Sequence, residues 1–173
     1  MTYRPERKNM SAVFLSIFCF VFSVIAFYIA HKIGLYMWVY QVAAIILAVF
    51  ALQIFLKYVQ SDYVYKADEH DLKIYKITGD KSVCVCSLNY EESISGVMTA
   101  EYAAKNKNNY PQTKIALNFC KNIFPNEYSL YYFNFNGKAS VLKFEPDEIF
   151  TNFVNEKISA AKRAVENEEN DYE

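Results

Sequence analysis

Two long stretches without a charged residue constrain this chain more than any other feature of its sequence. Residues 11–30 and residues 35–56 carry no charge, and Gln41 and Gln53 are the strongly polar members of the second stretch. A helix over either stretch is roughly 30 Å long at about 1.5 Å per residue, which matches the hydrocarbon thickness of a bilayer. Soluble helices of this length normally carry a polar face. We therefore predict a hairpin of two membrane-spanning helices, rather than two buried helices of a soluble core.

The charges that flank this hairpin predict its orientation. Arg4, Arg7 and Lys8 precede the first helix, whereas the connection at residues 31–34 contains Lys32 as its one positive residue. An excess of Lys and Arg marks the cytosolic side of a membrane protein. We therefore expect an integral membrane protein with both termini and the soluble part in the cytosol. The aromatic residues expected at the outer interface are Tyr28, Tyr36 and Trp38.

Small residues line one side of each predicted helix. They recur at alternating steps of three and four, which keeps them on one face, and such faces let membrane helices approach closely. Gln41 should lie level with Ser23, and an amide without a partner costs free energy in hydrocarbon. We predict a Gln41–Ser23 hydrogen bond, with a contact from Gln41 to a second copy or another protein as the alternative. The residues expected to pack between helices are Ser16, Cys19, Ser23, Ala26, Gln41, Ala44, Ala48 and Ala51.

The rest of the chain has the composition of one β-rich domain. The sequence contains 15 Tyr and 14 Phe but only four Gly and four Pro, a balance typical of packed strands rather than of linkers. Asn136 and Gly137 form the dipeptide that favours a tight hairpin. An amphipathic helix is expected to begin near Pro146. The seven strands predicted from alternating apolar residues are 62–67, 72–78, 82–89, 92–98, 113–120, 127–135 and 138–144.

Seven antiparallel strands followed by an amphipathic helix suit a small barrel, because the helix can cover the open end of a strongly bent sheet. The apolar hairpin, the strand and turn at 72–80, and the closing run at 144–150 with Pro146 and Asp147 resemble bacterial pleckstrin-homology-like (PH-like) domains attached to membrane hairpins. The resemblance implies an α+β protein of the bacterial plasma membrane. It also implies a PH-like, seven-stranded barrel or sandwich capped by a C-terminal helix, and a non-enzymatic role.

The expected organisation has four parts. Residues 1–10 form a cytosolic N-terminal tail, residues 11–57 the transmembrane hairpin, residues 58–165 the PH-like domain, and residues 166–173 an acidic disordered tail. From Tyr58 onward the chain has thirteen Lys and Arg against eighteen Asp and Glu, which argues against a nucleic-acid partner.

The turn expected between the first two strands, residues 68–71, carries three acids and His70. The phosphoinositide-binding members of the wider PH superfamily carry basic residues there. Because like charges repel, the acidic turn argues against phosphoinositide binding.

The cysteines of the soluble part allow two interpretations. Cys84 and Cys86 are two residues apart, so on a regular strand they point to the same side, and Cys120 ends another predicted strand. A three-thiolate metal site with Cys120 is one interpretation. We favour the other, in which all three are small apolar residues without a metal.

No arrangement typical of catalysis occurs in the sequence. His31 and His70 lack convincing partners, and the chain contains no Gly-rich phosphate loop and no nucleophile elbow. We therefore predict no enzyme activity and no cofactor. The predicted function is a membrane-anchored interaction module that binds a partner protein or a second copy of the chain. An accessory subunit of a transporter or membrane-enzyme complex, and a lipid-sensing domain, are the alternatives.

Lys105 and Lys107 lie in the longest region expected to be irregular. They could contact anionic lipid or an acidic partner surface, or they could simply belong to a solvated loop.

Overall fold

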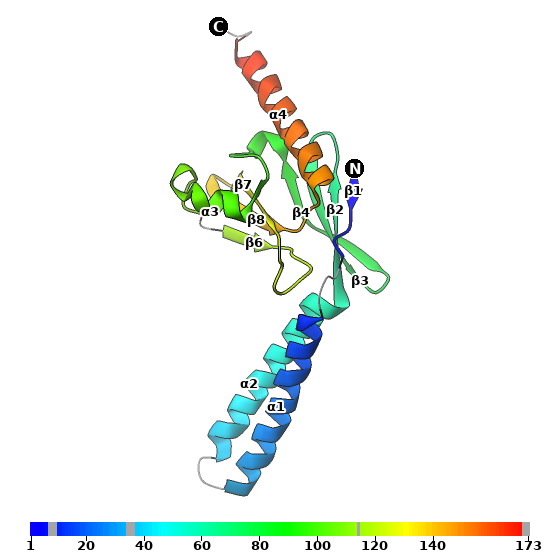
Figure 1. Cartoon of the computed structure of the whole chain (residues 1–173), viewed down its shortest axis with the longest axis vertical. Helices are drawn as coiled ribbons and strands as arrows, with labels where there is room; N and C mark the ends of the chain where they lie inside the picture. Colours follow the sequence, from blue (N-terminus) through cyan, green and yellow to red (C-terminus); the bar gives the residue numbers. More distant parts are fainter. Residues whose placement is uncertain (7–9, 34–36, 114, 171–173) are drawn as a thin grey trace. The chain divides into compact units, whose positions relative to one another are not determined.

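The computed structural model of this chain describes residues 1–6, 10–33, 37–113 and 115–170, which form two compact units (Figure 1). The hairpin unit consists of Arg7–Asp62 with Asn122–Phe124, and the β-domain consists of Met1–Glu6, Tyr63–Lys121 and Pro125–Glu173. Some residues used in the sequence analysis lie outside the described residues, namely Arg7, Lys8, residues 34–36, residue 114 and residues 171–173.

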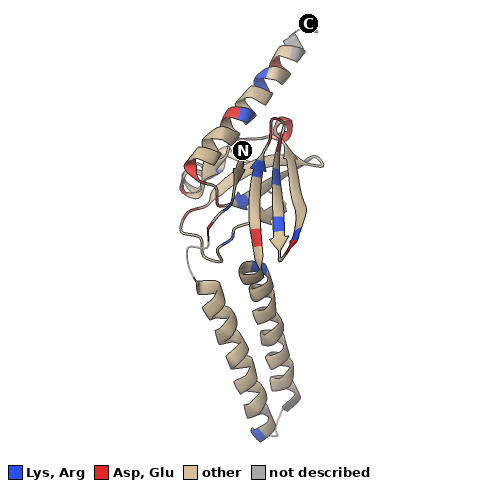
Figure 2. Cartoon of the chain, turned by 90° about the vertical axis from the view of Figure 1, so that its right-hand side faces the viewer, with Lys and Arg blue, Asp and Glu red and all other residues tan. Residues whose placement is uncertain are grey.

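The hairpin unit contains two apolar helices, as the sequence predicts. Helix α1 spans Ser11–Ile33 and helix α2 spans Met37–Ile54, and both are long and apolar enough to cross a membrane. Charged residues are almost absent along them (Figure 2). Helix α2 continues as a π-helix, η1 (Phe55–Gln60). The Ser61 hydroxyl then donates a hydrogen bond of 2.7 Å to the Leu56 carbonyl, which satisfies a carbonyl that a helix end leaves without an intrahelical partner.

The β-domain contains two four-stranded sheets. The first has the order β1-β2-β3-β4 and the second the order β5-β7-β8-β6. The seven-stranded barrel or sandwich expected from the sequence is therefore not confirmed in its strand number or its closure, because the described residues contain eight strands and no closed sheet. The bounds are β1 Thr2–Tyr3, β2 Ser61–Ala67, β3 Asp71–Thr78, β4 Lys81–Asn89, β5 Met98–Thr99, β6 Ile115–Asn118, β7 Ser129–Phe135 and β8 Lys138–Phe144.

The predicted strand at 92–98 is the clearest departure within the second sheet. It is replaced by the 3-10 helix η2 (Tyr90–Glu92), a single bridge from Ser93 to Phe133, and the two-residue strand β5. A side chain explains the break, because the Asn155 amide accepts a hydrogen bond from the Val97 backbone N–H (2.7 Å) and donates one to the Val97 carbonyl (3.0 Å). Backbone groups satisfied by a side chain are not available to a neighbouring strand.

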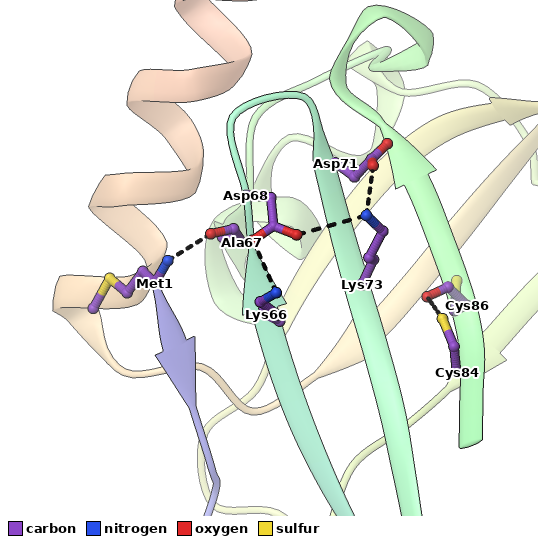
Figure 3. A network of polar contacts seen from close by, with 8 residues as sticks. All are labelled: Met1, Lys66, Ala67, Asp68, Asp71, Lys73, Cys84 and Cys86. Atoms are coloured by element: carbon purple, nitrogen blue, oxygen red, sulfur yellow. Dashed lines mark hydrogen bonds and ion pairs between the residues drawn. The ribbon is translucent and has the colours of Figure 1, made fainter. Parts of the chain in front are cut away.

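The N-terminal residues expected to form a tail instead complete the first sheet. Strand β1 pairs antiparallel with β2, with Thr2 opposite Lys66 and Tyr3 opposite Tyr65. The Met1 ammonium donates to the Ala67 carbonyl (2.6 Å) and the Ala67 N–H donates to the Met1 carbonyl (2.8 Å), as Figure 3 shows for the first of these bonds. The segments on either side of the hairpin are thus joined by strand pairing within the β-domain.

Helix α4 (Glu148–Asn170) covers the core of the β-domain. Its first turn is capped by Asp147, whose carboxylate accepts a hydrogen bond of 2.7 Å from the Phe150 N–H. Phe150, Val154 and Ile158 are buried among apolar residues of both sheets. The helix reaches Asn170, so residues 166–170, expected to be part of a disordered tail, are helical. Alanine has the highest helix propensity of the amino acids, and the alanines at 160, 161 and 164 favour this extension.

Candidate functional site

Strand β4 is an exposed edge strand of the β-domain with a largely apolar sequence. It lies at the edge of the first sheet, paired with β3 on one side and with no second strand among the described residues. The residues from Lys81 to Val85 are exposed, and the side chains of Val83 and Val85 are 59% and 39% exposed. No charge occurs between Lys81 and Glu91. Such an edge offers backbone donors and acceptors to an added strand without the charges that usually protect sheet edges.

A β-bulge changes the direction of side chains along β4. Ile74 on β3 is opposite Cys86, whereas the next residue, Tyr75, is opposite Cys84, so Val85 is the extra residue. Because Ile74 and Tyr75 are neighbours on a strand, they face opposite sides of the sheet, and their partners do the same. The prediction that Cys84 and Cys86 share a side is therefore wrong.

The two thiols have different surroundings as a result. Cys86 is half-buried against the core, whereas Cys84 is exposed, and its thiol donates a hydrogen bond of 3.4 Å to the Cys86 carbonyl (Figure 3). Burial, with a smaller contribution from Cys84, raises the pKa of the Cys86 thiol to about 11. A thiol with this pKa stays protonated at neutral pH and is a weak nucleophile. Cys120 is buried, and no group of His, Cys, Asp or Glu that could hold a metal occurs in the described part of the chain.

The turn between β2 and β3 carries acids that are paired with lysines. Lys73 lies 2.9 Å from Asp71 and 3.6 Å from Asp68, and Lys66 lies 3.4 Å from Asp68 (Figure 3). A hydrogen bond to the Asp71 carboxylate raises the pKa of Lys73. The lysines offset two of the three acids at this turn, which leaves Glu69 and His70 as its exposed members.

The predicted helix-packing residues lie along the inside of the hairpin. Ser16, Ser23, Ala44 and Ala51 are buried. The half-buried members of the set are Cys19, Ala26, Gln41 and Ala48. Large side chains point outward instead and are well exposed, among them Phe14, Phe18, Ile45 and Ile46.

The predicted hydrogen bond between Gln41 and Ser23 is wrong, because Ser23 has a different acceptor. The Ser23 hydroxyl donates to the backbone carbonyl of Ala44 at 2.7 Å, one helical turn from Gln41, while the Ser16 hydroxyl donates to Val13 in its own helix. Gln41 makes no hydrogen bond through its side chain with any residue that the structure describes. The sequence correctly predicts that Ser23 faces this part of the second helix. It does not show that a backbone carbonyl, rather than the Gln41 side chain, accepts the hydrogen bond from Ser23.

Lys105 and Lys107 are both exposed but lie on short helical elements rather than in an irregular loop. Lys105 ends helix α3 (Ala100–Lys105) and Lys107 begins the 3-10 helix η3 (Lys107–Asn109). Thr99 caps α3 by accepting a hydrogen bond from the Tyr102 N–H.

The geometry therefore offers an exposed, uncharged sheet edge as the candidate site. The signal for it in the sequence is the uncharged run at residues 82–90, but this run alone cannot show that β4 lies at an edge. Comparison of the chain with protein-family models, with curated proteins and with solved structures finds no match.

Proposed function

We propose that this chain is a membrane-anchored, non-enzymatic interaction module, with its hairpin in the bacterial plasma membrane and its β-domain at the cytosolic face. The observation that carries the proposal is the exposed, uncharged edge of β4. The partner is a protein that supplies an extended segment to this edge, so that main-chain hydrogen bonds continue the sheet. Confinement to a membrane raises the effective concentration of such a site for partners that are also membrane-bound.

The outward faces of the hairpin support the membrane location. Large apolar side chains such as Phe14, Phe18 and Ile46 are more than half exposed within the hairpin unit. In water an apolar surface of this extent costs about 25 cal/mol for every Å² that is left uncovered. Lipid tails cover it at no such cost.

A PH-like domain remains our proposal for the β-domain. It is supported by two sheets whose shared core is covered by an amphipathic C-terminal helix. The parallel pairing of β6 with β8 departs from the consecutive antiparallel order on which the resemblance rests.

Purification in mild detergent tests the proposal, with the interaction measured by quantitative mass spectrometry. We compare the wild type with a Val83→Lys, Val85→Lys variant, which places two charges on the edge, and with a Phe135→Lys control at another exposed apolar position. Loss of a stoichiometric partner from the β4 variant, and its retention by the control, is the expected result.

Other outcomes of this experiment contradict parts of the proposal. A partner lost only from a Lys105→Glu, Lys107→Glu variant moves the site to α3 and η3. A chain that arrives alone, as one oligomer with bound lipid, removes the support for an adaptor and favours lipid sensing.

Gln41 favours a second candidate, an accessory subunit of a transporter or membrane-enzyme complex. Its amide is half-buried and has no hydrogen bond within the described residues, and an apolar medium makes an unpaired amide costly. A helix of another subunit could supply the partner. Gln41→Leu should then release that subunit, whereas Gln53→Leu, at the other amide of α2, which is exposed, should not.

A further inference from the structure

The loop between β6 and β7 carries a second exposed apolar feature, which is separate from the β4 edge. Its residues Asn122–Phe124, here called the loop tip, belong to the hairpin unit, although the chain on both sides belongs to the β-domain. Phe124 is 63% exposed, the highest value for any described phenylalanine outside the hairpin helices, and its neighbour Ile123 is half-exposed.

The start of this loop packs against the first residues of β2, which directly follow the hairpin in the chain. The candidate span ends at Gln60 and β2 begins at the next residue, so no linker separates them. Two residues further on, Tyr63 packs edge-to-face against Phe119, with ring centroids 5.7 Å apart. Phe119 precedes the loop tip by only three residues, which span about 10 Å even when fully extended.

Hydrogen bonds hold the stem of the loop in place. The Tyr65 hydroxyl donates to the Phe119 carbonyl (2.9 Å), and the Phe119 N–H donates to the Lys143 carbonyl (2.9 Å). The buried carboxylate of Glu145 then accepts a hydrogen bond of 2.8 Å from the Lys121 N–H, immediately before the tip. A loop held this way presents its apolar tip from a fixed support.

We infer that the loop tip is a membrane anchor, in which Phe124, with Ile123, inserts into the headgroup region of the bilayer beside the end of the hairpin. This inference rests on the proposed insertion of the hairpin. Aromatic rings are favoured at this depth, where apolar surface leaves water without entering the hydrocarbon core. Lys57 and Tyr58, with the ammonium 5.1 Å from the ring centroid, lie on η1 near the end of the candidate span and are residue types favoured at the interface. The tip thereby limits rotation of the β-domain on its tether.

Fluorescence of single tryptophans in lipid vesicles tests the anchor. Trp38, the only tryptophan of the chain, reports on the hairpin in the wild type. In a Trp38→Phe background, Phe124→Trp places the reporter at the tip, and Phe135→Trp places it at the exposed end of β7 as the matched control. Vesicles of phosphatidylcholine carry bromine near the top of the acyl chains as a quencher. We expect loss of emission from residue 124, with a shift to shorter wavelength, and no loss from residue 135.

The other outcomes distinguish failure of the membrane anchor from failure of the proposed membrane insertion of the hairpin. If Trp38 is quenched but residue 124 is not, the anchor is wrong while the membrane hairpin stands. A shift to shorter wavelength at residue 124 without quenching also overturns the anchor, because protein then covers the ring. Quenching at both 124 and 135 overturns it as well, since the whole domain then adsorbs to lipid. If neither residue 38 nor residue 124 is quenched, insertion of the hairpin itself is contradicted.

Discussion

Three tyrosines in the core of the β-domain differ in how their hydroxyl groups are hydrogen-bonded. The Tyr65 hydroxyl donates to the Phe119 carbonyl and accepts from the Glu145 N–H, and the hydroxyls of Tyr131 and Ser93 share a hydrogen bond. The Tyr90 hydroxyl is fully buried and has no hydrogen-bond partner among the described residues. A buried hydroxyl without a partner costs about 1–3 kcal/mol of stability.

This contrast predicts opposite effects of the same substitution. Tyr90→Phe removes an unsatisfied hydroxyl and should leave the free energy of unfolding unchanged or raise it by roughly 1 kcal/mol. Tyr65→Phe leaves the Glu145 N–H without its partner and should lower that free energy by about 1–3 kcal/mol. Urea unfolding of the detergent-solubilised protein, followed by near-ultraviolet circular dichroism, measures both. A destabilised Tyr90→Phe variant would show that this hydroxyl has a partner after all.

The buried phenols also predict a loss of stability at high pH. Burial raises the pKa of Tyr131 to about 12, and burial likewise raises the pKa values of Tyr65 and Tyr90. An unfolded phenol ionises near pH 10, so above that pH the unfolded chain loses protons that the folded chain keeps. The stabilisation is complete below about pH 10 and is lost as the pH rises toward 12. Unfolding measured across this window should show a shallower decline for Tyr131→Phe, and equal slopes would contradict the assignment.

Within the hairpin, one hydrogen bond joins the two helices through Ser23. Ser23→Ala should weaken their packing by about 0.5–1.5 kcal/mol, because the hydroxyl that reaches Ala44 is lost. Ser16→Ala is the matched control, since that hydroxyl bonds within its own helix and is also buried. Unfolding in mixed micelles with increasing dodecyl sulfate compares the two, and a Ser16→Ala effect as large as that of Ser23→Ala would contradict this role.

At the scale of elements, the sequence predicted the helices and strands whose residues follow one pattern over many positions. The two helices of the hairpin and the strands β3, β4, β7 and β8 follow from charge-free length or from alternation over seven to nine residues. Strand β1 has two residues and therefore no period to detect.

Features that depend on contacts between residues distant in the sequence could not be predicted from such local patterns. The break at 92–98 depends on Asn155, far along the chain on α4, and the parallel position of β6 depends on β8. The bulge at Val85 is a matter of hydrogen-bond register, so counting residues assigned Cys84 to the wrong side. The edge position of β4, on which the candidate site depends, is likewise set by the order of strands rather than by their sequence.

For the whole molecule, strand pairing predicts membrane topology independently of charge. Because β1 and β2 pair within one sheet, the N-terminal segment and the β-domain must lie on the same side of any membrane that the hairpin crosses. With the β-domain in the proposed cytosolic location, a maleimide that cannot cross membranes should label exposed Cys84 in inverted vesicles but not in intact cells. A His31→Cys variant, at the turn of the hairpin, should show the opposite pattern. Labelling of both residues from one side would contradict a spanning hairpin.

The pairing of β1 with β2 also sets an order of events during synthesis. The first strand leaves the ribosome early but has no partner until both helices and β2 have followed, some sixty residues later. In a chain in which only one of the two helices crosses, β1 and β2 lie on opposite sides of the bilayer, and β2 keeps an open edge that invites degradation. Completion of the first sheet thus serves as a quality check, passed only by chains in which both helices span the membrane.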